Sequence, residues 1–336
     1  MTGTPGATIL GVSGTHVTPD EAAFFRQADP WGFILFARNV ETPDQVHRLT
    51  AALRDTVGRD APILVDQEGG RVQRLRAPHW REWMAPLDEA TATGPLAGQA
   101  FALRYRLIAH ELHTVGIDAN CAPCLDLARP ETHPFLRNRC LGSDPATVAA
   151  IGRAAANAML AGGVLPILKH MPGHGRGIAD SHHDLPGTDA PLAELLTTDF
   201  APFIALSDLP LAMSAHMHYR QIDSQPGTTS AAITALIRHR IGFHGLLMTD
   251  DIGMNALSGT PATRAAAALA AGCDVVLHCN GTLAEMHAVA DIAGPLTGPA
   301  QSRAARALTF RRPPDPVDIE ALEADLRALH AGTANG

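Results

Sequence analysis

Residues 164–170, Val-Leu-Pro-Ile-Leu-Lys-His, form a short apolar run that ends in two polar side chains. Runs rich in Val, Ile and Leu are typical of strands that are buried on both faces of a parallel sheet. Runs of this kind recur along the chain at residues 7–13, 32–38, 62–67, 117–126, 164–170, 210–217, 245–250 and 273–279. They predict eight buried parallel strands and therefore an α/β fold.

Helical segments are expected between most of these strands. Thr42-Pro43, Asp144-Pro145 and Thr260-Pro261 each place an N-cap residue before a proline at the first helical position. Glycines that can end a helix precede the next strand at Gly116, Gly242 and Gly272. Eight strands that alternate with helices predict a single-domain (β/α)8 TIM barrel, and a doubly wound open sheet is the alternative.

No linker or low-complexity tract divides the chain, and 336 residues that are 46% hydrophobic are ample for one large core. We expect the catalytic barrel to occupy residues 1–312. The remaining residues, 313–336, are expected to form a C-terminal helix over 318–330 and a tail, packed on the barrel or trailing it.

Charge and composition narrow the classes of partner. The net charge is −8 and no lysine/arginine run is present, which argues against nucleic acid. No apolar stretch approaches the roughly 18 residues of a membrane span. The start of the chain lacks a signal-peptide pattern, and five cysteines do not indicate a disulfide framework. We expect a cytoplasmic protein without a cofactor, either a monomer or a weak homo-oligomer.

The predicted strand ends are unusually polar. In a (β/α)8 barrel the active site lies at the C-terminal ends of the strands. Seven of the eight predicted strands bring charged or hydrogen-bonding groups to that rim, at residues 38–39, 66–71, 126, 169–170, 216 and 218, 250–251, and 280. Structural ion pairs could account for any one of these groups. Polar groups at seven strand ends on the same rim instead predict a functional site.

Lys169 is the only lysine among 26 lysine and arginine residues. A position that keeps lysine against so strong a preference for arginine is one that needs a compact ammonium group rather than a planar guanidinium. Chance is the competing explanation for this single residue.

The loop after residues 164–170 is long, from Met171 to about Pro186, and contains three glycines and three histidines. Barrel loops of this length usually carry function. Within it, Asp180 precedes His182 by two residues, so its carboxylate can accept the imidazole N–H and raise the basicity of the ring. A surface turn is the alternative interpretation.

Three segments together resemble a known family. VDQEGGRVQRL (65–75), KHMPGHG (169–175) with DSH (180–182), and MTDDIGM (248–254) are similar to the bacterial β-N-acetylglucosaminidases of glycoside hydrolase family 3. The resemblance runs from about residue 7 to 295. Members of this family trim N-acetylglucosamine from recycled cell-wall fragments on a β/α barrel. The resemblance is to the single-domain branch, in which a loop histidine–aspartate pair replaces an acid from a second domain.

The resemblance assigns roles to individual residues. It implies that Asp250 is the nucleophile, His182 the acid/base and Asp180 the partner of that histidine. It also implies a small carbohydrate substrate, GlcNAc-anhydroMurNAc with or without peptide, and no metal. The residues implied to hold the sugar are Asp66, Arg74, Arg139, Lys169, His170 and His216. Met171 and residues 137–140 depart from the usual family pattern, and Asp251 is expected to be structural.

Two other functions remain open at this point. Seventeen histidines and the His216-Met217-His218 pair are compatible with a metal-dependent hydrolase on the same barrel. A non-catalytic sugar-binding barrel is the second alternative. Cys121 and Cys124 have CxxC spacing, but they lie inside an apolar run, where packing is the expected role.

Overall fold

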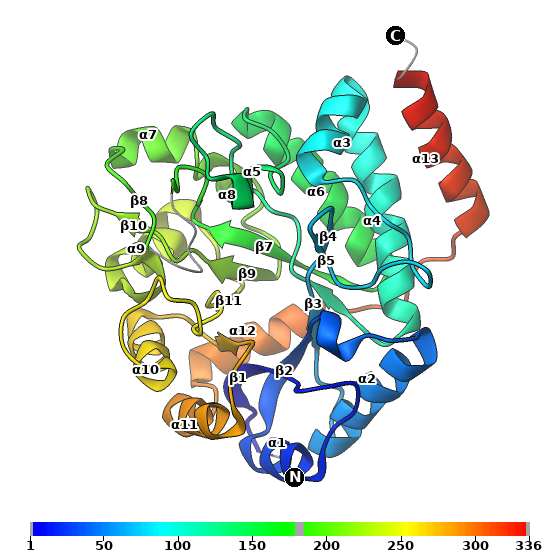
Figure 1. Cartoon of the computed structure of the whole chain (residues 1–336). Helices are drawn as coiled ribbons and strands as arrows, with labels where there is room; N and C mark the ends of the chain where they lie inside the picture. The colour runs from blue at the N-terminus through cyan, green and yellow to red at the C-terminus, as the bar shows by residue number, and fades with distance from the viewer. Residues whose placement is uncertain (1–2, 179–184, 334–336) are drawn as a thin grey trace.

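The centre of the computed structural model, which describes residues 3–178 and 185–333, is an eight-stranded parallel sheet (Figure 1). Its strands, in order around the sheet, are β1 (Gly6–Gly11), β2 (Pro30–Leu35), β3 (Ile63–Val65), β6 (Ala119–Asn120), β7 (Leu165–Met171), β9 (Leu211–Ser214), β11 (Leu246–Met248) and β12 (Val276–His278). β12 pairs with β1, and a parallel bridge between Met248 and Val275 links β11 to the segment that leads into β12. The sheet is thus a barrel, which confirms the predicted (β/α)8 fold and excludes the open sheet.

Helices follow the strands and surround the barrel (Figure 1). They are α1 (Pro19–Ala28), α2 (Pro43–Val57), α3 (Pro86–Thr93), α4 (Ala97–Thr114), α5 (Pro134–Arg137), α6 (Pro145–Ala161), α7 (Leu192–Thr197), α8 (Ala201–Ala205), α9 (Ala231–Leu236), α10 (Pro261–Ala271), α11 (Leu283–Ala293), α12 (Gly298–Leu308) and α13 (Ile319–Thr333). The predicted caps are confirmed: the side chains of Thr42, Asp144 and Thr260 each accept a hydrogen bond from a backbone N–H in the first turn.

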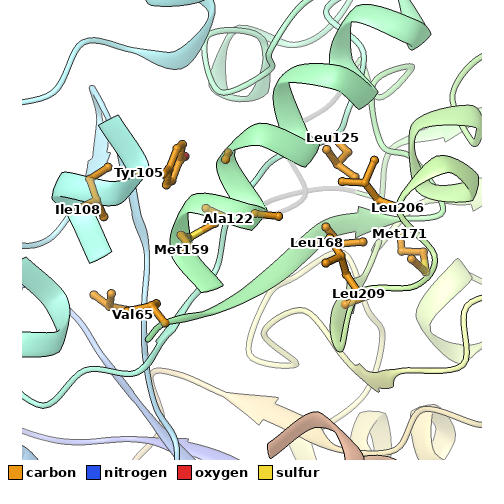
Figure 2. Packing of buried hydrophobic residues seen from close by; sticks show 14 of the residues in the cluster. Val65, Tyr105, Ile108, Ala122, Leu125, Met159, Leu168, Met171, Leu206 and Leu209 are labelled. Atoms are coloured by element: carbon orange, nitrogen blue, oxygen red, sulfur yellow. The ribbon is translucent and has the colours of Figure 1, made fainter. Parts of the chain in front are cut away.

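Apolar side chains form two layers because successive strand residues face opposite sides of the sheet. In β11, Leu246 and Met248 face the barrel interior, whereas Leu247 packs outward against the helices. Figure 2 shows part of the outer cluster, including Met159 of α6 and Leu168 of β7. α12 packs against the inner cluster through its alanines, Ala300, Ala304 and Ala307.

Several strands are shorter than predicted at their C-terminal ends. The predicted strands 62–67 and 245–250 end at Val65 and Met248. The polar residues beyond these points, among them Asp66 and Asp250, leave the ladder and line a pocket. Strand 117–126 is reduced to Ala119–Asn120 and a bridge at Cys124, because Pro123 has no backbone N–H to donate.

A small hairpin that we did not predict follows β3. It consists of β4 (Gln67–Gly69) and β5 (Val72–Gln73), which are antiparallel. Its turn contains Gly69 at φ 112° and Gly70 at φ 56°, and a Cβ at Gly70 would lie 2.9 Å from Ala85. Only glycine adopts this backbone conformation without strain. The hairpin places Glu68 and Arg74 at the rim of the barrel.

The C-terminal helix α13 packs against α3 and α4 (Figure 1). Leu326 and Leu329 are buried in this contact, and His330 Nε2 lies 3.1 Å from the carboxylate of Glu89. The division of the chain at residue 312 stays a prediction. In the described part of the chain, no helix is long and apolar enough to cross a bilayer.

Candidate active site

A pocket of about 270 Å³ opens at the C-terminal ends of the barrel strands. Its lining brings together six of the residues implied by the family resemblance, namely Asp66, Arg74, Arg139, Lys169, His170 and Asp250. These residues come from segments that follow β3, β5, α5 and β11 and from β7 itself. The fold therefore collects side chains that are up to 184 positions apart in the sequence.

Lys169 lies at the centre of a buried charge network. Its Nζ is 2.9 Å from Asp66 Oδ1 and 2.5 Å from Glu68 Oε1, and only 1% of the side chain is exposed. Burial alone would lower the pKa of Lys169, but the two carboxylates outweigh it and hold the pKa well above its usual value. The lysine therefore stays charged.

Replacing Lys169 with methionine is expected to lower the free energy of unfolding by about 3–5 kcal/mol, because the buried Glu68 and the partly buried Asp66 lose their shared counter-charge. Activity should fall at least 100-fold, since hydrogen bonds from a charged donor contribute about 1.5–3 kcal/mol each. Urea unfolding and kcat/KM measure the two effects. Lys169→Arg should also lose activity, because the larger guanidinium does not fit a buried point-charge site.

The pH dependence of stability provides a control for this prediction. Lys169 and Arg74 hold the pKa of the partly buried Asp66 below its usual value, so that carboxylate stabilises the fold above about pH 4, and this contribution is lost on acidification. The raised pKa of Lys169 stabilises the fold below about pH 10. The loss of unfolding free energy in Lys169→Met should therefore be largest between about pH 4 and pH 10. An additional Asp66→Asn substitution should restore part of the stability, and a Lys169→Met protein as stable as wild type would contradict the network.

Arg139 is held by Glu68, a residue that sequence reasoning placed on the rim without giving it a role. Arg139 donates to Glu68 through Nε at 3.0 Å and through Nη2 at 2.8 Å. Burial favours the neutral form of Glu68, but Arg139 and Lys169 hold its pKa below the usual value. This bidentate pair fixes the guanidinium at the pocket although residues 137–140 depart from the family pattern.

His170 is oriented by Asp126, which we had noted only as a polar strand end. Asp126 Oδ2 lies 2.7 Å from His170 Nδ1, and Oδ1 accepts the backbone N–H of His174 at 2.6 Å. Burial opposes the charge on Asp126, but the neighbouring His170 ring lowers its pKa to about 2. An ionised carboxylate only accepts, so His170 carries its proton on Nδ1 and presents Nε2 to the pocket.

Asp250 and its neighbour Asp251 have different surroundings. Asp250 lines the pocket with 16% of its side chain exposed, and its Oδ2 lies 4.0 Å from His170 Nε2. Asp251 also borders the pocket, but its Oδ1 is occupied by backbone hydrogen bonds from Gly253 at 2.9 Å and Cys279 at 3.1 Å. One carboxylate is thus available to a ligand, and the other holds the loop.

His216 is buried beside this aspartate pair. Its Nδ1 lies 2.8 Å from Thr228 Oγ1, and its Nε2 lies 3.0 Å from the carbonyl oxygen of Asp251. His218, in a short rim strand β10 (His218–Tyr219) that pairs with β8 (Gly187–Thr188), instead contacts the carbonyl oxygen of Asp223. The two histidines do not converge, which removes the geometric basis for a metal site at this pair.

His174 is a pocket residue that we did not predict as part of the site. It is 2% exposed, and neither ring nitrogen has a hydrogen-bond partner among the described residues. Burial lowers its pKa to about 4, so the ring is neutral near pH 7. Its position between two glycines in a loop rich in histidine was the available sequence signal.

Asp180 and His182 lie outside the described residues. The loop that contains them leaves the described chain at Ile178 and returns at Leu185. Their roles stay predictions from the sequence.

The described residues define a class of site. The Asp250 carboxylate faces a pocket lined by fixed cationic and imidazole donors, at the end of the barrel where active sites of this fold lie. Carboxylates and hydrogen-bond donors side by side in one pocket suit a polyhydroxylated ligand such as a sugar. The site is that of a carbohydrate-active barrel enzyme.

Comparison with known proteins agrees with this class. The N-terminal domain of glycosyl hydrolase family 3 matches residues 13–306. A β-hexosaminidase of Bordetella avium is 36% identical over 97% of this chain and 94% of its own, and one of Xanthomonas campestris pv. campestris is 39% identical over 82% and 85%. The crystal structure of NagZ from Neisseria gonorrhoeae has a TM-score of 0.82 at 29% identity, covering 99% of this chain and 98% of its own. The chain belongs to glycosyl hydrolase family 3 and is a glycoside hydrolase.

Proposed function

We propose that this enzyme is a retaining exo-β-N-acetylglucosaminidase that removes terminal N-acetylglucosamine from peptidoglycan-derived muropeptide fragments during cell-wall recycling. The observation that carries the proposal is Asp250, an accessible carboxylate in a pocket lined by fixed hydrogen-bond donors. The names of the curated relatives support the substrate class, as does a gonococcal NagZ structure in complex with N-trifluoroacetyl-D-glucosamine.

The proposed substrate is a small carbohydrate, GlcNAc-anhydroMurNAc with or without peptide. The pocket volume of about 270 Å³ lies just below the roughly 300–1,000 Å³ of sites for drug-sized ligands, which suits one terminal sugar. Lys169, Asp66 and Arg139 are held rigidly by one another and by Glu68, so they can orient ring hydroxyls without reorganising.

The proposed reaction has two steps. In the first, Asp250 forms a bond to the anomeric carbon while the glycosidic C–O bond breaks, and His182 gives its proton to the departing oxygen. In the second, His182 takes a proton from water, whose oxygen bonds to the anomeric carbon and releases Asp250. Two displacements retain the β configuration. Asp180 supports the positive charge of His182 in the first step.

For His216, which does not line the pocket, we propose a positioning role in place of the expected sugar contact. Its contacts with Thr228 and with the Asp251 backbone fix the segment that carries Asp250. We also propose a cytoplasmic location, because all five cysteines are buried and free, as expected in a reducing compartment.

The function is tested by following hydrolysis of GlcNAc-anhydroMurNAc by proton NMR. The β-anomer of N-acetylglucosamine should appear first, and the α-anomer only later through mutarotation. No metal or cofactor should be needed, so activity should persist in a chelator. Release of the α-anomer first would exclude a retaining mechanism, and absence of any release would exclude the substrate and favour a non-catalytic sugar-binding barrel.

A further inference from the structure

Arg104 is a buried arginine of α4 that does not line the sugar pocket. Its side chain is 0% exposed, and it pairs with Glu89 of α3, whose side chain is 1% exposed. The guanidinium carbon lies 5.3–5.7 Å from the ring centroids of Trp83, Phe101 and Tyr105. A buried ion pair is often no more stabilising than apolar residues of similar volume, so stability alone does not account for this pair.

The same guanidinium holds the backbone of the β4–β5 hairpin, which lies beside α3 and α4 (Figure 1). Arg104 Nη1 donates to the Glu89 carboxylate, and Nη2 donates to the carbonyl oxygen of Glu68 and, at 3.0 Å, to that of Met84. Glu89 also lies 3.1 Å from His330 Nε2 of α13. A planar fork with several donors can serve these acceptors together, and it ties the hairpin to three helices.

Gly69 makes room for this contact. A Cβ at Gly69 would clash with Arg104 Nη2 and would lie 2.6 Å from the carbonyl oxygen of Met84. The first glycine of the VDQEGGRVQRL segment therefore serves two purposes, because it adopts a positive φ and leaves space for the guanidinium.

Glu68 connects Arg104 to the sugar pocket. Its carbonyl oxygen accepts from Arg104, whereas its carboxylate lies 2.5 Å from Lys169 Nζ and 2.8 Å from Arg139 Nη2. The carbonyl and the carboxylate belong to one residue, so a shift of the hairpin backbone moves the carboxylate as well. Lys169 and Arg139 both line the pocket, and their alignment therefore depends on the place of the hairpin.

We propose that Arg104 is a positioning residue for sugar binding, because it fixes the backbone of Glu68. The Glu68 carboxylate in turn sets the places of the Lys169 ammonium and the Arg139 guanidinium. The inference rests on the proposed function, in which these two groups contact the sugar. A residue that aligns other groups should affect binding even when the stability of the fold is restored.

Replacing the whole ion pair separates the two effects. Arg104→Met/Glu89→Met removes both charges and keeps apolar volume, so the urea midpoint should stay near that of wild type. KM for an aryl N-acetylglucosaminide should still rise at least ~10-fold, the contribution of one hydrogen bond to a charged group, with a smaller change in kcat. A wild-type KM in this variant would give Arg104 a purely structural role and overturn the proposal.

Arg104→Lys is a second variant, which keeps a positive charge beside Glu89. One ammonium group cannot replace a fork that serves three acceptors, so KM should again rise. Arg238→Met is the matched control, because Arg238 is 14% exposed, pairs with the buried Asp274 and does not line the pocket. It should lose stability and keep the wild-type KM. An equal rise in KM in Arg238→Met would contradict a specific role for Arg104.

A double-mutant cycle in urea tests the alignment without hydrolysis. Lys169→Met should raise the unfolding equilibrium constant at least about fivefold less in the Arg104→Met/Glu89→Met background than in wild type, because Glu68 is already displaced. In the Arg238→Met background its effect should match that in wild type within about twofold. Equal effects in all three backgrounds would overturn the proposal. Coupling in a wild-type enzyme that releases no N-acetylglucosamine would instead contradict the proposed function and leave the positioning role supported.

Discussion

Replacing Asp250 with alanine is expected to lower kcat by on the order of 10⁴-fold or more, because the covalent route through this carboxylate disappears. The fold should be retained, since the Asp250 side chain lines the pocket and, among the described residues, accepts one hydrogen bond, from its neighbour's backbone N–H at 2.8 Å. The measurement is kcat on an activated aryl N-acetylglucosaminide, together with the unfolding midpoint.

Asp251→Asn is the matched control for this prediction. Its carboxylate accepts from the backbone of Gly253 and Cys279, and these bonds together with the nearby His278 hold its pKa below the usual value despite burial. Asparagine keeps one acceptor oxygen, so the substitution should cost no more than the free energy of one hydrogen bond to a charged group, about 1.5–3 kcal/mol of stability. The corresponding loss in kcat should be about 10- to 100-fold at most. If Asp251→Asn were as inactive as Asp250→Ala, the assignment of the nucleophile would be wrong.

Replacing His182 with alanine is expected to lower cleavage of the natural disaccharide fragment by about 10²- to 10⁴-fold, the usual contribution of a proton donor. The loss should be much smaller for glycosylation by an aryl substrate, because a phenolate leaves without protonation. Since the same histidine activates water, the glycosyl-enzyme on Asp250 should accumulate. Steady-state and burst kinetics on both substrates separate these effects.

Asp180→Asn should show a milder form of the same pattern, because it removes the partner that supports the charge on His182. Ser181, the residue between them in the sequence, provides a matched control: Ser181→Ala should behave like wild type. An equal loss on aryl and disaccharide substrates in His182→Ala would indicate a structural or binding role instead.

The fold was predictable because the same sequence patterns, an apolar run for a strand and a cap for a helix, recur along the chain. Eight apolar runs and three Thr/Asp-Pro caps each pointed to the same alternation of strands and helices, and the structure contains all of them. The ends of the strands were not predictable from apolarity. Asp66 and Asp250 continue apolar runs in sequence but leave the ladder, because their side chains are directed to the pocket.

The candidate site was predictable where a motif or a compositional bias singled out a residue. Lys169 is the only lysine in the sequence, and the structure places it between the carboxylates of Asp66 and Glu68. The partners were harder to predict. Glu68 and Asp126 act through Arg139 and His170, and these pairings exist only once the barrel has closed. The hairpin that presents Glu68 depends on two positive φ angles at Gly69 and Gly70, which the apolar pattern does not encode.

The central claim is that Asp250 forms a covalent bond to the sugar. A fluorinated N-acetylglucosaminide with a good leaving group slows the second step, and His182→Ala slows it further, so the intermediate can be trapped. Mass spectrometry of the digested protein should then show one sugar mass on the peptide that contains residues 248–254, with the fragment ions placing it on Asp250. A sugar attached to any other residue, or an inactivated enzyme without added mass, would contradict this account.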